Sequence, residues 1–272
     1  MSTADTSTVD QSRRPTEHPS NLGPVVRPSF VRLTRIELRK AVDYRAGRWI
    51  LGVIVGLAVL ALGWLVWASW HDPQGEIMFR DFAGAALAAA AFLLPVLGIL
   101  AMTSEWSQRT ALTTFTLSPR RIPVLLAKLV AALLLMLGVM VAITVVAALA
   151  TALAGAISPD SVTWAGEDPW SYWAGQYLTQ AMFVLMGAGF GALIPITGVA
   201  LTAFFVAPFL FAVLANTLLK HVGSWFDVFS AFDRIGQFKL DGKGWESLTS
   251  ILIWVVVPIV AGLYLSNRRE VK

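Results

Sequence analysis

Long apolar stretches dominate the chain and determine its predicted architecture. A helix needs about 20 apolar residues to cross the hydrocarbon core of a bilayer. Runs of that length recur along the sequence, and none shows the period-two alternation of a membrane barrel. The pattern predicts an all-α polytopic membrane protein with six transmembrane helices. They lie at about residues 49–70, 82–102, 124–157, 177–196, 199–219 and 248–265.

Two of these predicted spans have unusual boundaries. The third is too long for one perpendicular crossing, so we expect it to tilt or to project beyond the bilayer. The fourth and fifth are separated only by a short segment containing Pro195, Thr197 and Gly198. Helix breakers at this position favour a tight hairpin over one very long helix.

The distribution of basic residues predicts how the spans are oriented. Sixteen of the 21 Lys and Arg residues lie before the first span, between the second and third, or after the sixth, and five lie on the opposite side. Because Lys and Arg are enriched in cytoplasmic loops, we expect both termini in the cytoplasm. No cleavable signal peptide is evident, since the first apolar run starts near residue 49.

Composition narrows the class of protein further. Hydrophobic residues make up 56% of the 272 residues and charged residues 14%, which excludes a water-soluble enzyme and a disordered chain. The chain has no Cys and three isolated His residues, so we expect neither a disulfide framework nor a metal centre built on those ligands. No phosphate-binding loop is present, because the Gly-Lys-Gly at 242–244 lacks the required spacing.

The region before the first span divides into a tail and a basic segment. Residues 1–28 are polar and contain Ser, Thr and Pro throughout, which predicts a disordered cytoplasmic tail preceding one transmembrane domain at 29–272. Residues 30–47 mix apolar side chains with cations, which predicts a helix lying on the cytoplasmic membrane surface. An ordinary basic flank of the first span is the alternative. The charged candidates here are Glu37, Arg39, Lys40 and Arg45.

The segment between the second and third spans, 103–128, has a pattern that suits a docking site. Residues 107–117 predict a short helix that ends before Pro119. Glu105 and Arg109 form an i,i+4 pair in the favourable order. Three cations beyond them are expected to extend to the lipid headgroups: Arg120, Arg121 and Lys128. Docking of a cytosolic partner and a topological anchor without a partner both explain this pattern.

The longest loop on the other side, 219–247, is rich in aromatic residues at helical spacing. A fully solvated loop would not be so aromatic, so we predict amphipathic external helices before the last span. These helices serve either as a belt at the membrane interface or as a gate at the outer end of a pathway.

Polar side chains inside the spans are few and mild. No Asp, Glu, Lys, Arg or His lies in the middle of a predicted span, which argues against an ion-coupled secondary transporter. The remaining polar candidates are Gln176, Gln180 and Asn216. They either line a pathway or form hydrogen bonds between helices. The pairs Gly52–Gly56 and Gly187–Gly191 permit close helix contact, within the chain or in a dimer.

Two short stretches carry a recognisable motif pattern. They are Glu37-Leu38-Arg39-Lys40 with Asp43 and Arg45-Ala46-Gly47-Arg48-Trp49, and Glu105-Trp106-Ser107-Gln108-Arg109-Thr110 with Pro119-Arg120-Arg121 and Lys128. Together with the six-span plan, they resemble the ABC-2-type permease family, the membrane subunits of ABC exporters, in its actinobacterial form. The likeness covers the chain from about residue 30 to its end.

The resemblance implies a transport subunit without an active site of its own. Two permeases, as identical copies or paralogues, would pair with two cytosolic ABC ATPase subunits. ATP and Mg would be bound by those partner subunits, and this chain would bind no cofactor directly. The surface helix and the helix after the second span would contact the ATPases. The coupling residues carried over are Glu105, Trp106, Arg109 and Thr110, with Arg120 and Arg121 bracing the loop.

These observations together predict a permease that exports a hydrophobic or amphipathic substrate across the bacterial cell membrane. Its expected partners are the lipid bilayer, a second permease and the ATPase subunits, and no nucleic-acid partner is expected. The alternatives are a membrane anchor, a membrane-embedded enzyme and a secondary transporter not coupled to ATP.

Overall fold

The computed structural model describes residues 29–71, 77–107, 121–159, 162–164, 169–218 and 222–268. The predicted tail, residues 1–28, lies outside them. The described chain is helical apart from one parallel pair of two-residue strands. Its elements are α1 (Phe30–Asp43), α2 (Arg45–His71), β1 (Ile77–Met78), α3 (Phe79–Ser107), α5 (Arg121–Ile157), β2 (Val162–Thr163), α6 (Pro169–Leu193), α7 (Thr197–Leu218), η1 (Gly223–Trp225), α8 (Val228–Gly236), α9 (Gly244–Ile251), η2 (Leu252–Val256) and α10 (Val257–Arg268).

The structure confirms the predicted helical architecture with long apolar helices that could cross a membrane, and its described residues show four or five such helices rather than six. Four described helices are long and apolar enough to cross a membrane: α2, α5, α7 and the continuous helix 244–266. Helix α3, bent by 40° between 79–88 and 90–105, makes a fifth if its two parts form one span. Helix α6, which overlaps the fourth predicted span, does not meet the same test. Its sequence places glutamine, threonine and several glycines where the other helices carry larger apolar side chains.

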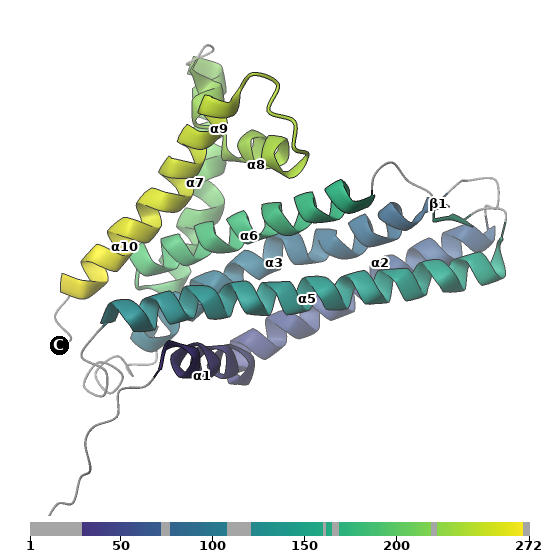
Figure 1. The fold of residues 1–272 in the computed structure, drawn as a ribbon, viewed down its shortest axis with the longest axis horizontal. Helices are drawn as coiled ribbons and strands as arrows, with labels where there is room; N and C mark the ends of the chain where they lie inside the picture. The colour runs from purple at the N-terminus through teal and green to yellow at the C-terminus, as the bar shows by residue number, and fades with distance from the viewer. Residues whose placement is uncertain are drawn as a thin grey trace, which may run out of the picture.

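The helices form an elongated bundle with α6 at its centre. Helices α2, α3, α5 and α6 run along the long axis of the molecule, and α7 and α10 cross α6 near one end (Figure 1). Helix α6 packs against α3, α5, α7, α8 and α10. Helix α1 lies at the same end as the beginning of α5 and the end of α10 (Figure 1).

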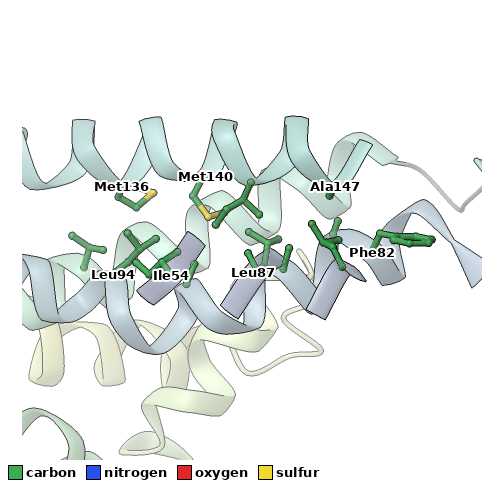
Figure 2. Close-up of a cluster of buried hydrophobic side chains, with 14 of the residues drawn as sticks. Ile54, Phe82, Leu87, Leu94, Met136, Met140 and Ala147 are labelled. Atoms are coloured by element: carbon green, nitrogen blue, oxygen red, sulfur yellow. The ribbon is translucent and has the colours of Figure 1, made fainter. Parts of the chain in front are cut away.

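One apolar core lies between α2, α3 and α5. Side chains of α5 face those of α3, with α2 beside them (Figure 2). The labelled members are Ile54, Phe82, Leu87, Leu94, Met136, Met140 and Ala147. A second core joins α6, α7, α8 and the segment around Trp254. Because lipid tails are as apolar as these side chains, close packing rather than transfer from water holds such cores together.

Glycines bring the backbones of α3 and α6 into contact. A Cβ atom at Gly191 would lie 2.7 Å from the carbonyl oxygen of Ile99. A Cβ atom at Gly187 would overlap the carbonyl oxygen of Pro95 in the same helix, α3. In contrast, a Cβ atom at Gly52 or Gly56 would meet nothing within 4 Å. The Gly187–Gly191 pair therefore serves packing within the chain, while the face of α2 that carries Gly52 and Gly56 is open.

A short break separates α6 and α7, as predicted, but the two helices cross rather than form a tight hairpin (Figure 1). Helix α6 ends at Leu193 and α7 begins at Thr197, with Pro195 in the short connection. Proline cannot donate the backbone hydrogen bond that a continuous helix would need there. The two helices therefore separate at the position that the sequence indicates.

Helices also occupy the aromatic segment before the last long helix. Asp227 caps α8 by accepting a hydrogen bond from the backbone N–H of Ser230 at 3.2 Å. Helix α9 then continues through η2, a π-helical turn, into α10. The indole N–H of Trp254 in this turn donates to the carbonyl of Phe226 at 2.8 Å. This bond holds the aromatic segment against the last helix.

Candidate functional site: a buried network of four charges

Four charged side chains meet inside the bundle near one end. The ammonium group of Lys128 lies 2.8 Å from Glu37 Oε2 and 3.2 Å from Glu105 Oε1. The ammonium group of Lys40 lies 2.8 Å from Glu37 Oε1 and 3.3 Å from Glu105 Oε1. Each lysine therefore bridges both glutamates. We call these four residues the charge network.

The network connects three helices that are far apart in the sequence. Glu37 and Lys40 belong to α1, Glu105 to the last turn of α3, and Lys128 to the second turn of α5. The i,i+3 spacing of Glu37 and Lys40 places both on one face of α1. Ser29 starts this helix by accepting a hydrogen bond from the backbone N–H of Arg32 at 3.3 Å.

Three of the four side chains are almost completely enclosed. Lys128 is 2% exposed, Glu105 3% and Glu37 8%, whereas Lys40 is 35% exposed. An isolated charge at such a depth would cost several kcal/mol of solvation free energy. Two positive and two negative charges offset one another here, and Lys128 gains a further acceptor in the carbonyl of Ala101 at 3.1 Å. Lys128 thus donates hydrogen bonds to Glu37 and Ala101 and forms an ion pair with Glu105.

The partners on both sides keep the α1 members of the network ionised. Burial by itself raises the pKa of Glu37, but attraction to Lys128, with the hydrogen bonds from Lys128 and Lys40, brings that pKa below its ordinary value. Burial lowers the pKa of Lys40, and its hydrogen bond and attraction to Glu37 outweigh this effect and raise the pKa. The salt bridge is therefore the form present at neutral pH.

The C-terminal end of α3 also contacts α7. Thr103 is fully buried, and the hydroxyl of Thr197, the first residue of α7, donates to its side-chain oxygen at 2.9 Å. The end of α3 is thus joined by polar contacts to α1, α5 and α7. A displacement of this end has to be accommodated by all three helices.

The structure brings together three of the predicted site residues and separates others. Glu37, Lys40 and Glu105 meet in the network, whereas Arg39 pairs with Asp43 at 3.9 Å on the exposed side of α1. Arg45 is exposed at the start of α2. The expected partner of Glu105, Arg109, lies outside the described residues, as do Thr110 and Arg120. The side chains of Trp106 and Arg121 also lie outside them.

Sequence reasoning missed the most buried member of the network. Lys128 was expected to extend to the lipid headgroups, and this prediction is wrong, because Lys128 is 2% exposed and bound to two carboxylates. The signal was present in the sequence: a single lysine lies within an otherwise apolar stretch of α5. A charge in such a position requires a partner, and the acids available were distant in sequence.

The polar candidates within the helices have different surroundings. Gln180 is 5% exposed, and its side-chain N–H donates to the carbonyl of Ala90 in α3 at 3.5 Å, which supports its role as a bond between helices. Gln176 lines a cavity of about 710 Å³ at the opposite end of the bundle from the network, between α6, α8 and the start of α3. The side chain of Asn216 lies outside the described residues.

A second cavity, of about 360 Å³, adjoins the network itself. Its walls come from α1, the start of α2, α3 and α5, and they include Glu37, Lys40 and Lys128. No group of three or more His, Asp or Glu side chains suited to a metal ion occurs in the described part of the chain. The ion pairs of the network thus join α1, α3 and α5 beside a cavity.

The sequence matches no protein-family model and no curated protein.

Proposed function

We propose that the chain is the permease subunit of an ATP-driven exporter in the bacterial cell membrane, moved by ATPase subunits that are separate polypeptides. The observation that carries the proposal is the charge network, which joins α1, the end of α3 and the start of α5 at one end of a bundle of membrane helices. The motif resemblance of residues 37–49 and 105–128 supports the same function.

A joint of this kind is what mechanical coupling to a cytosolic motor requires. Helix α1 lies against α5, α3 and α2, and the network fixes it to α5 and to the last turn of α3. A force applied by a partner to α1 or to the segment after residue 105 is passed directly to helices that cross the membrane. The fully paired charges favour this mechanical role over a proton relay, in which an acid has to gain and lose a proton.

The proposal also specifies the number of membrane spans and their orientation. Six spans, with α6 as the fourth, place both termini and the charge network in the cytoplasm. The segment containing Glu105, Trp106, Arg109 and Thr110 then faces the ATPase, with Arg120 and Arg121 bracing it. ATP and Mg are bound by the partner, and two permeases form the complete pathway for a hydrophobic or amphipathic substrate.

Affinity purification of the tagged full chain from native membranes in mild detergent tests this function. A cytosolic ATPase that copurifies, with ATP hydrolysis sensitive to vanadate, is the expected result. Crosslinking in intact membranes before solubilisation guards against loss of a partner in detergent. A chain that is recovered without an ATPase after crosslinking contradicts the proposal and leaves the membrane anchor as the better reading.

Two matched variants then test the site. Glu105→Gln removes a carboxylate of the network, and Asp81→Asn removes an exposed carboxylate at the other end of the same helix. We expect E105Q to lower ATP turnover per copurified ATPase and D81N to leave it unchanged. Equal turnover in the two variants would refute the coupling role of Glu105. Replacement of Arg120 and Arg121 by Ala tests the bracing role in the same assay.

A further inference from the structure

The cavity beside the charge network is a consequence of how α1 turns into α2. Helix α1 ends at Asp43, and Tyr44 adopts an extended backbone conformation that redirects the chain. Gly47 is buried against the carbonyl of Ala41, in a space that no Cβ atom could share. A larger residue at Gly47 would displace this turn, and a cavity of about 360 Å³ lies beside it.

The inner wall of this cavity is apolar and made largely of small side chains. Leu97 and Leu100 come from α3, as does Ala101, and Ala131 and Ala132 come from α5. Alanine at these positions leaves room that larger residues would fill. The cavity adjoins the first turns of α2, a helix long and apolar enough to cross a membrane, so an inserted α2 would bring this wall close to lipid chains.

The charged side chains that line the cavity in the described part of the chain are three cations and two carboxylates, so cations are in excess by one. Among the described residues, Lys40 has acceptors for two of its three N–H donors, and its side chain is 35% exposed on the cavity. Arg45 also lines the cavity and is exposed. Two carboxylates also line the cavity: Glu37, which binds both network lysines, and Asp43, whose exposed side chain lies 3.9 Å from Arg39. The group that complements this excess is an anion with several oxygen atoms.

We propose that this cavity binds an anionic phospholipid from the leaflet that borders α1. The phosphate accepts the remaining N–H of Lys40 and lies beside the guanidinium of Arg45, and an acyl chain occupies the apolar wall. An apolar slot continuous with a cationic mouth fits a lipid better than a soluble anion, which would leave the slot empty. The site does not depend on the proposed transport function.

Phosphatidylglycerol and phosphatidylcholine with identical acyl chains are the probes for this site. The full chain, purified in a neutral detergent, is titrated with each lipid, and bound lipids are counted by native mass spectrometry alongside the thermal unfolding midpoint. We expect selective retention of phosphatidylglycerol and a higher midpoint in its presence. Equal retention of both lipids would overturn the proposal. So would displacement of the lipid by glycerol phosphate at a similar concentration, because the headgroup alone would then suffice.

Paired variants separate a specific site from general attraction to a cationic surface. Arg45→Gln removes a charge that lines the cavity, and Arg48→Gln removes a neighbouring exposed charge that does not. We expect phosphatidylglycerol binding about fivefold weaker in R45Q and nearly unchanged in R48Q. Equal weakening in both would show surface adsorption only and overturn the proposal.

A second pair tests whether the lipid occupies the interior of the cavity. Ala46→Trp places a large ring at the exposed mouth, whereas Val55→Trp places one on an open face of the same helix. Loss of the retained lipid in A46W but not in V55W is expected. Retention in A46W would overturn the proposal. If A46W lowers the thermal unfolding midpoint even without lipid, the comparison of R45Q with R48Q decides whether the cavity binds the lipid. Those two substitutions are at exposed side chains and should not disturb folding.

Discussion

Replacing Lys128 by Met is the most direct way to test the charge network. Methionine preserves much of the length and apolar character of the side chain while removing its charge and its three donors. Glu37 loses its 2.8 Å contact, Glu105 its 3.2 Å contact, and the carbonyl of Ala101 its 3.1 Å hydrogen bond. Lys40 remains beside both carboxylates, so the site keeps one of its two positive charges.

The size of the effect follows from the burial of these groups. Removing one partner of a buried ion pair costs about 3–5 kcal/mol of unfolding free energy, because the other charge stays buried without compensation. We expect about 3 kcal/mol for K128M, at the lower end of that range, since Lys40 continues to offset part of the negative charge. This corresponds to a roughly 100-fold change in the unfolding equilibrium.

Unfolding in mixed micelles, followed for a full double-mutant cycle, provides the assay. Glu37→Gln and Lys128→Met are measured separately and together, and the double variant should cost less than the sum by about 0.5–3 kcal/mol. The control is Arg80→Met, which breaks an exposed contact of 4.0 Å to Asp81 and should cost less than about 1 kcal/mol. Equal losses for K128M and R80M, or additive effects of the network pair, would refute the reasoning.

Three further predictions follow from other contacts. The pKa of Glu37 is lowered in the folded chain, so its contribution to folding stability is complete above the ordinary pKa of 4.5 and is lost as the pH falls through the lowered pKa. Spin labels on α1 and α5 should therefore move apart only in acid. Gly187→Leu should prevent α3 and α6 from packing, whereas Gly52→Leu should leave the unfolding midpoint nearly unchanged. Trp254→Phe should cost about 0.5–1.5 kcal/mol in the same unfolding assay by removing the hydrogen bond to Phe226.

The apolar helices were predictable because bilayer thickness imposes a minimum length on every span. The predicted and observed boundaries differ mainly at helix ends, because the polar first turn of a helix is not part of the apolar run. Helix α2 begins at Arg45 rather than near residue 49, and α5 begins at Arg121 rather than at 124. Helix α6 differs for another reason: neighbouring helices enclose it, so its residues need not be as apolar as those of a lipid-facing span.

The role of the two glycine pairs was not predictable, since the sequence shows only that close approach is permitted. The backbone of α3 fills the space beside Gly187 and Gly191, whereas Gly52 and Gly56 face open space. The two pairs have the same spacing and similar apolar neighbours. The difference arises from which helix lies opposite, and a single sequence does not contain that information.

The candidate site was predictable in part. The sequence indicated Glu105 and the α1 charges as important, but it assigned each to its nearest sequence neighbour or to the membrane surface. The actual contacts span 65 residues between Lys40 and Glu105 and 91 between Glu37 and Lys128. Local spacing rules cover pairs three or four residues apart, and they cannot find partners at this separation.

A buried network of this kind acts more on the position of α1 than on overall stability. An apolar contact of equal volume is often as stabilising as a buried ion pair, so stability alone does not account for four charges at this depth. An apolar α1 surface has many similar positions along α5, whereas Glu37 and Lys40 reach Lys128 and Glu105 together in one register only. The outward face of α1 still carries apolar side chains, including Phe30 and Val31, that contribute no such restriction. We therefore expect the network to determine where α1 lies, and motion of α1 relative to α3 and α5 to break these ion pairs or to move them as a unit.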